Sequence, residues 1–335
     1  MSVVILYSII FIVNGIGIHV YRKYAISRKI VANPNFRTLH VSPVPTGGGI
    51  VFSAAFVTHL FWFWWIGQLS DDLFLVLGVG GGVAALFGFL DDVRDINASK
   101  KLAAQFLLSS WVIFWLDVDS LLYVGWLPTL IVILLTMLFF VWMINAYNFM
   151  DGIDGMAISG AVFISGAITL VLLLTNGSSE LTILFMLLLS SSSAFLFFNW
   201  PPATIFMGDS GSVFLGYIFG SLILVTIMND DISIWTWLIV FGYFFADTAV
   251  TQIMRVILVK KWYLAHRSHA YQNLARITES HLKVTGSVAL YNIFWILPLT
   301  LWSALQPEMS LIAVVLAVTP GLVVAYKYGP VLSST

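Results

Sequence analysis

The sequence predicts an all-α polytopic membrane protein with ten to eleven transmembrane helices. The chain has 335 residues, of which 60% are hydrophobic and only 9% are charged, whereas a soluble domain carries about 25% charged residues. Its mean hydropathy of +0.97 indicates the same class. The chain contains no Cys, which excludes disulfides, thiolate metal ligands and cysteine nucleophiles.

Apolar segments of membrane-spanning length occur along the whole chain. A spanning helix needs about 20 mostly apolar residues, with a lower limit near ~17. The first segment lacks a basic leader and a small-residue cleavage site, so we interpret it as a membrane helix rather than a signal peptide. We expect spans at 2–20, 47–66, 73–90, 102–117, 127–144, 156–175, 181–198, 211–228, 234–254, 286–305 and 310–326, or ten spans if one pair is misassigned.

The charges of the connecting loops give the orientation. The alternate loops on one side are 21–46, 91–101, 145–155, 199–210, 255–285 and the tail after 326, and they hold all 15 Lys and Arg of the chain. Because basic residues concentrate on the cytoplasmic side, the N-terminus is predicted outside and the C-terminus in the cytoplasm. The opposite loops carry only acids: Asp71, Asp72, Asp117, Asp119, Glu180, Asp230, Asp231 and Glu308.

The whole chain, 1–335, is therefore interpreted as one integral-membrane domain with its function on the cytoplasmic face. The inner loops are long and the outer loops are short. The polar residues that could support chemistry gather on the inner side. They lie in the loops 37–49, 88–105, 145–157, 201–212 and 255–285.

The stretch GFLDDVRDINASKKLAAQ, 88–105, ends one helix and begins the next. Asp91 and Asp92 follow an apolar run directly, which places them at the membrane surface and favours a functional role. Arg94 and Asp95 suit a solvated loop of mixed charge. The two lysines that follow, 100–101, are membrane-surface anchors by default, with contact to a phosphate as the alternative.

The stretch NAYNFMDGIDGMA, 145–157, carries two Asn and two Asp at three-residue steps. Asn145, Asn148, Asp151 and Asp154 would share a helix face in successive pairs, and the Gly after each Asp permits a broken backbone. Capping of the next helix explains one such residue. It does not explain four residues and two glycines, so we expect a functional site.

The stretch PPATIFMGDSGSVFLG, 201–216, has one carboxylate, Asp209, among small residues just before a helix. Backbone N–H groups of residues 208–212 at a helix N-terminus would suit a phosphate. A plain N-cap is the alternative. The stretch RTLHVSPVPTGGGIVF, 37–52, with His40, Thr46 and Gly47–Gly49, supports either close approach of a phosphate or sugar or a simple turn.

Two further groups lie on the inner side. In KKWYLAHRSHAYQNLAR, 260–276, Arg267 stands between His266 and His269 and favours a pyrophosphate clamp, since guanidinium binds phosphate bidentately. Zinc is disfavoured because no third ligand is evident. Asp247 lies inside the ninth apolar segment, where acids are rare and usually functional or paired. A structural pair with a neighbouring Lys or Arg is the alternative.

Taken together, these residues favour metal-assisted phosphoryl transfer between a soluble diphosphate and a membrane lipid. Carboxylates beside phosphate-binding backbone suit Mg²⁺, with Mn²⁺ as a substitute, because Mg²⁺ prefers one or two carboxylates plus substrate oxygens. The metal would neutralise the diphosphate and stabilise the leaving phosphate. A groove between helices would admit the lipid.

The strings GFLDDVRD, NAYNFMDGIDGMA, FMGDSGS and HRSHAYQ, in this order, resemble the polyprenyl-phosphate N-acetylhexosamine-1-phosphate transferase family, glycosyltransferase family 4. The resemblance spans about residues 37–276. It implies a bacterial inner-membrane enzyme with a cytoplasmic active site. Such an enzyme moves a sugar 1-phosphate from a UDP-N-acetylhexosamine to undecaprenyl phosphate and releases UMP.

The resemblance also implies roles for individual residues. Asp209 would be the metal ligand, and one member of the Asp91–Asp92 pair would deprotonate or orient the lipid phosphate. Asp151 and Asp154 complete the catalytic candidates. The expected substrate-binding residues are Thr46, Gly48, Lys101, Asn145, Asn148, His266, Arg267 and His269.

The form of the histidine loop differs from the multi-histidine version of the muramoyl-pentapeptide enzymes. It resembles the surface-polysaccharide branch, which implies a 6-deoxy sugar substrate and a product such as lipid-linked O-antigen. A proline that the family often carries before the acid of the ninth helix is missing near Asp247, so the resemblance assigns that residue no role. No nucleic-acid partner is expected, and a homodimer is left open.

An ion-coupled secondary transporter that uses the membrane carboxylates is the competing function. Transporter sites lie near the bilayer midplane and are often built on internal repeats. Here the acids are predicted at one membrane surface, and the sequence shows no long-period repeat. These two features favour the transferase.

Overall fold

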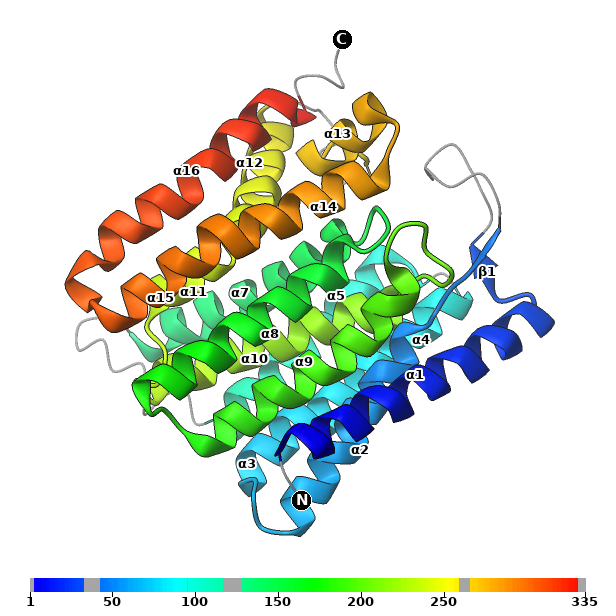
Figure 1. Ribbon diagram of the computed structural model, residues 1–335, viewed down its shortest axis with the longest axis horizontal. Coiled ribbons are helices and arrows are strands. Elements are labelled where there is room, and N and C mark those ends of the chain that lie inside the picture. Colours follow the sequence, from blue (N-terminus) through cyan, green and yellow to red (C-terminus); the bar gives the residue numbers. More distant parts are fainter. Residues whose placement is uncertain (1–2, 33–42, 95, 117–127, 259–265, 331–335) are drawn as a thin grey trace.

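The computed structural model describes residues 3–32, 43–94, 96–116, 128–258 and 266–330, and it confirms the all-α class. Figure 1 shows long helices running side by side in one bundle, with the start of α1 and the end of α16 at opposite ends. His40, Asp95, Asp117, Asp119 and 259–265 lie outside the described residues.

The helices follow the predicted order. Their bounds are α1 Val3–Ser27, α2 Gly49–Trp65, α3 Asp71–Leu73, η1 Phe74–Gly80, α4 Gly81–Arg94, α5 Ala98–Trp115, α7 Thr129–Met150, α8 Met156–Thr175, α9 Ser179–Asn199, α10 Asp209–Met228, α11 Ile234–Val240, α12 Gly242–Leu258, α13 Ala270–Thr278, α14 His281–Tyr291, η2 Asn292–Ile296, α15 Leu297–Leu305, η3 Pro307–Met309 and α16 Ser310–Tyr328. Two short strands, β1 Val31–Ala32 and β2 Val44–Pro45, form an antiparallel pair that was not predicted.

Within the described part of the chain, eight helices are long and apolar enough to cross a membrane. A ninth span results if α11 and α12, which are bent by 79°, count as one. The two remaining predicted spans are α2, which has only 17 residues, and α5, which carries Lys100, Lys101 and Gln105 in its first half. In the described part of the chain, eight or nine of the predicted spans meet this criterion, and α2 and α5 occupy the positions of the other two.

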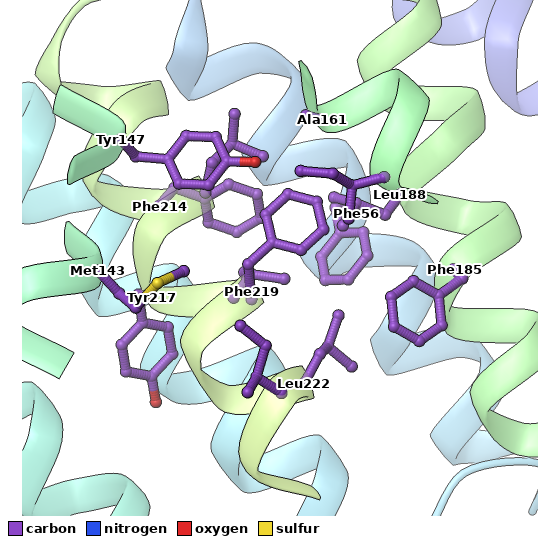
Figure 2. Close-up of a cluster of buried hydrophobic side chains, with 14 of the residues drawn as sticks. Phe56, Met143, Tyr147, Ala161, Phe185, Leu188, Phe214, Tyr217, Phe219 and Leu222 are labelled. Atoms are coloured by element: carbon purple, nitrogen blue, oxygen red, sulfur yellow. The ribbon is translucent and has the colours of Figure 1, made fainter. Parts of the chain in front are cut away.

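The core surrounds α10. In the apolar stretch of this helix 89% of the residues are buried, against 17% in α1. Figure 2 shows Phe219 and Leu222 of α10 facing side chains from neighbouring helices, among them Tyr147 of α7 and Phe185 of α9. The residue at the start of α10 is therefore held by the most deeply packed element of the molecule.

Two helices extend beyond the predicted spans near the polar stretches. The helix expected to end at 144 continues to Met150 as α7, because Asn145 and Asn148 find hydrogen-bond partners on neighbouring helices. The span expected from 211 begins at Asp209. The loop 255–285 also contains a helix that was not predicted, α13, which lies at the top of Figure 1.

Candidate active site

The predicted polar residues meet where α4 and α7 end and where α5 and α10 begin. Asp209 is the first residue of α10. The Nδ2 atom of Asn148 donates to Oδ1 of Asp209 at 2.6 Å and also lies 3.1 Å from Oγ of Ser212. The ammonium of Lys101 lies 3.3 Å from the other oxygen of Asp209. Three helices thus converge on one carboxylate.

Lys101 is shared between two carboxylates. Its ammonium also pairs with Oδ2 of Asp91, while Oδ1 of Asp91 accepts the N–H of Ile96 at 2.7 Å. The Asp91 side chain is only 3% exposed. A buried carboxylate is costly unless it is paired and hydrogen-bonded, so Lys101 and the N–H of Ile96 hold Asp91 in place at the end of α4.

Asp92 fastens the start of α10 to the end of α4. Its two oxygens accept the N–H groups of Asp209 at 2.7 Å and Ser210 at 3.0 Å. These donors are among the unpaired N–H groups of a helix start, which the sequence suggested for a phosphate. The φ of +72° at Gly208 favours glycine, and a Cβ there would stand 2.5 Å from an oxygen of Asp92.

Asp151 follows α7 directly, and its N–H donates to the carbonyl of Asn148 at 3.3 Å. Burial raises the pKa of its carboxyl well above the usual value, and the charges of Asp209, Asp92 and Asp154 raise it further. The carboxylates gathered here outnumber Lys101, so the site favours the arrival of a cation.

This charge excess fits a divalent cation bound jointly with a substrate. Among the described residues no three His, Asp or Glu side chains are placed to hold a metal by themselves. Mg²⁺ needs only one or two protein carboxylates when phosphate oxygens complete its shell. Asp209, with Asn148 and Lys101 at its two oxygens, is the carboxylate best placed to serve it.

Asp154 lies in the turn between α7 and α8, where it contacts the segment before α10 and helix α14. Its Oδ2 accepts the N–H of Ala203 at 2.9 Å, and its Oδ1 lies 3.1 Å from Nδ1 of His281. Its carbonyl accepts the hydroxyl of Thr285 at 2.8 Å. These contacts join the turn between α7 and α8 to the 201–208 segment and to α14, which indicates a structural contribution from a predicted catalytic residue.

Asn145 bonds to a different helix from Asn148. Its side-chain amide pairs with that of Gln105 on α5, at 2.9 Å and 3.3 Å. Gln105 stands one turn after Lys101, and Asn145 stands one turn before Asn148. The amide pair therefore holds α5 and α7 in the register that brings Lys101 and Asn148 to Asp209.

The glycine-rich stretch before α2 packs against the start of α10. The N–H groups of Gly48 and Gly49 donate to the carbonyls of Phe206 at 3.0 Å and Met207 at 2.9 Å. The carbonyl of Thr46 accepts the hydroxyl of Tyr21 at 3.2 Å. These donors have protein partners, so the structure favours helix packing over direct phosphate contact for Gly48.

The histidine loop lies beside the end of α7. His269 Nδ1 is 3.2 Å from Oδ1 of Asp247, and the His266 ring stacks on the His269 ring with centroids 5.1 Å apart. The hydroxyl of Tyr271 donates to the carbonyl of Phe149 at 2.5 Å. The structure thus brings the predicted histidines next to the NAYNFMDGIDGMA stretch.

Arg267 stands between the two histidines, and its carbonyl accepts Nη2 of Arg276 at 2.6 Å. Asp247 is fully buried. The sequence left open a pair with Lys or Arg for this acid, but its partner is His269.

Comparison with known proteins gives the family of this chain. The model of the family described as glycosyl transferase family 4 matches residues 74–227. A phospho-N-acetylmuramoyl-pentapeptide-transferase of Borreliella afzelii is 31% identical over 252 residues, covering 65% of this chain and 69% of the relative. This chain belongs to glycosyl transferase family 4.

Two other relatives of the transferase are named for polyprenyl phosphates. A probable undecaprenyl-phosphate N-acetylglucosaminyl 1-phosphate transferase of Bacillus subtilis is 27% identical over 273 residues, covering 78% of this chain and 74% of the relative. A decaprenyl-phosphate N-acetylglucosaminephosphotransferase of Mycolicibacterium smegmatis is 31% identical over 219 residues, covering 60% and 54%. The predicted family is confirmed, and the surface-polysaccharide branch stays a prediction.

Some site residues of this transferase escaped the sequence prediction. Gln105 and Ser212 bond to the two predicted asparagines, and Tyr271 joins α13 to α7. A glutamine four residues after Lys101 on an apolar helix is a signal that could have identified Gln105. The contact of Tyr271 depends on α13, which the sequence did not predict.

Proposed function

We propose that the transferase moves a sugar 1-phosphate from a UDP-N-acetylhexosamine to undecaprenyl phosphate at the cytoplasmic surface of the bacterial inner membrane. The observation that carries this proposal is the convergence of Asn148, Lys101 and Asp92 on Asp209 at one end of the bundle. Relatives named for polyprenyl-phosphate sugar-phosphate transfer support it.

The reaction is one displacement. A phosphate oxygen of the lipid attacks the phosphorus that carries the sugar, a new P–O bond forms, and the bond to the bridging oxygen of UMP breaks. Asp91, paired with Lys101, would orient the lipid phosphate. Asn148 and Lys101 hold the Asp209 carboxylate in one orientation, which reduces the reorganisation needed during the reaction.

Asp209 would hold Mg²⁺, which supplies charge neutralisation on the diphosphate. In support, the local carboxylates outnumber the lysine, and Asp209 stands on a fixed helix start. Arg267 and His266, on the loop beside α7, would contact the diphosphate of the donor.

The sugar is proposed to be an N-acetylhexosamine, with a 6-deoxy sugar for a lipid-linked O-antigen as the finer proposal from the form of the histidine loop. N-acetylglucosamine is the second candidate, because two of the relatives are named for it. Both donors carry the same UDP and acetamido groups. We therefore expect the protein to contact these groups in the same way, and only the contacts to the sugar ring to differ.

The test is UMP release by the purified chain with undecaprenyl phosphate and a panel of UDP-N-acetylhexosamines, with Mg²⁺ or with EDTA. Release that needs both lipid and Mg²⁺ and prefers one sugar supports the proposal. Asp209→Asn should lower the rate at least about a hundredfold, as loss of an electrostatic group at the reacting atoms does. Asp230→Asn, at the other, exposed end of α10, should retain wild-type activity.

Absence of UMP with every sugar, from protein that melts cooperatively, would contradict the transferase and favour the transporter. Equal UMP release by Asp209→Asn and the wild type would contradict the role proposed for Asp209 in metal binding.

A further inference from the structure

The Asp247 carboxylate accepts hydrogen bonds from the first residues of α13. Its Oδ1 accepts the N–H of Ala270, Nδ1 of His269 and the hydroxyl of Thr251, at 3.1, 3.2 and 3.1 Å, and its Oδ2 accepts the N–H of Tyr271 at 3.1 Å. Helix α13 begins at Ala270, so the carboxylate caps it and complements its dipole. This contact network goes beyond a simple ion pair.

The same carboxylate fixes the His269 ring. A ring nitrogen that faces a carboxylate carries a hydrogen and donates a hydrogen bond to it, and the His269 side chain is only 2% exposed. The ring packs 5.6 Å from the Phe149 ring and 5.1 Å from the His266 ring, at 31° and 25° between planes. The His266 ring therefore stacks on the His269 ring, and Asp247 sets the orientation of His269.

The protonation of His266 follows from its neighbour. The backbone N–H of Ser268 donates to its Nδ1 at 3.4 Å, and the hydroxyl of Ser268 lies 2.9 Å from the same atom. Nδ1 is therefore an acceptor, and the neutral ring carries its proton on Nε2. Burial, with the charges of His269 and Arg255, lowers the pKa of His266 to about 3 against the opposing effect of Asp247.

We propose that Asp247 is a positioning residue: it fixes the start of α13 and the His269 ring, so that the stacked His266 ring presents its Nε2–H to a phosphate oxygen of the nucleotide donor. The proposal rests on the proposed function, since it takes a UDP-sugar as the ligand. It gives the intramembrane acid, which the resemblance left without a role, a definite task in donor binding.

The experiment measures the dissociation constant of UDP by calorimetric titration of the full chain in detergent, and the KM for both substrates. Asp247→Asn should weaken UDP binding and raise the KM for the UDP-sugar, each about tenfold, as expected for one lost hydrogen bond to a charged oxygen. The KM for undecaprenyl phosphate should stay unchanged. His266→Gln should show the same loss, and the double variant should be no worse than His266→Gln alone.

Thr251→Val is the matched control, because it removes one hydrogen bond to the same carboxylate without touching His269 or α13. Its UDP affinity should stay within about twofold of the wild type. If Asp247→Asn fails to fold, His269→Gln keeps the helix cap and removes only the ring, and it should weaken UDP binding by the same factor.

The proposal is overturned if the wild type does not bind UDP, if Asp247→Asn binds UDP normally, or if the two losses multiply in the double variant. UDP binding is read without turnover. A chain that binds UDP through this pair of rings but releases no UMP would therefore contradict the proposed function alone.

Discussion

Lys101 is the cation that two acidic side chains share. Its ammonium pairs with Asp91 and lies 3.3 Å from Asp209, so its removal would leave two neighbouring carboxylates without their common partner. Loss of one partner from a buried charged pair is more damaging than loss of both. The neighbouring Lys100 is exposed and shares the charge but not these contacts.

We expect Lys101→Met to lower kcat/KM for UMP release at least about a hundredfold, because the orientation of Asp209 depends on the ammonium. Lys100→Met should stay within about threefold of the wild type, and Lys101→Arg should recover part of the loss. The measurement is steady-state UMP release from protein matched for melting temperature. Equal losses in the two methionine variants would contradict a specific role for Lys101.

Asp151 gives a pH-dependent prediction. Burial and the nearby acids raise its pKa in the folded chain, so the folded state retains a proton that the unfolded chain releases near pH ~4. The free energy of unfolding therefore falls as pH rises from about 4 toward the raised pKa of Asp151 in the folded chain. In EDTA, Asp151→Asn should raise the melting temperature at pH 7 and have almost no effect below about pH 4.

Melting curves at several pH values check this. Glu180→Gln is the control, because its carboxylate accepts the N–H of Ser70 among the loops predicted outside, away from the acidic cluster. A pH-independent shift in Asp151→Asn would contradict the assignment.

At the scale of elements, the site depends on how closely three helix ends approach. A Cβ at Gly49 would stand 2.2 Å from the backbone nitrogen of Gly211, and one at Gly88 would stand 2.2 Å from the carbonyl oxygen of Asp209. Backbone atoms cannot move aside as a flexible side chain can. These glycines therefore set the spacing of α2, α4 and α10.

Gly49→Ala should destabilise the chain by about 1–3 kcal/mol or more, the usual cost of overpacking. Gly286→Ala, where nothing lies within 4 Å of the new Cβ, should be neutral or stabilising by up to about 1 kcal/mol, since alanine favours a helix. Unfolding of both variants in the same detergent gives the comparison. A Gly49→Ala chain as stable as the wild type would contradict the close approach.

The sequence predicted elements better than it predicted partners. Hydropathy located the helices, since apolar length decides them, and it missed α13, which is short and polar on one side. Motif order brought out Asp209, Asn148 and Lys101, which do meet. It could not separate Asp92, whose oxygens cap α10, from Asp91, because adjacent residues on one helix acquire different partners only when the bundle packs.

At the scale of the whole molecule, the orientation in the membrane stays a prediction. The absence of Cys makes it testable by single-cysteine labelling. Asp72→Cys, on an exposed site of a loop predicted outside, should react with an impermeant maleimide in intact cells. Lys100→Cys, which is also at an exposed site, should react only after permeabilisation, and the opposite pattern would reverse the topology.

Asp209 and the histidine loop stand on elements that are packed to different degrees. The start of α10 is bonded to α4 through Asp92 and touches α2 at Gly49, and the helix beyond it fills the core. The start of α10 cannot move toward a ligand without breaking these contacts with α4 and α2. The histidine loop of the candidate site leads into α13, a nine-residue helix whose start is bonded to Asp247 and whose Tyr271 is bonded to the end of α7. Changes of sugar preference in this lineage should therefore accumulate on α13 and its loop, while the start of α10 stays as it is.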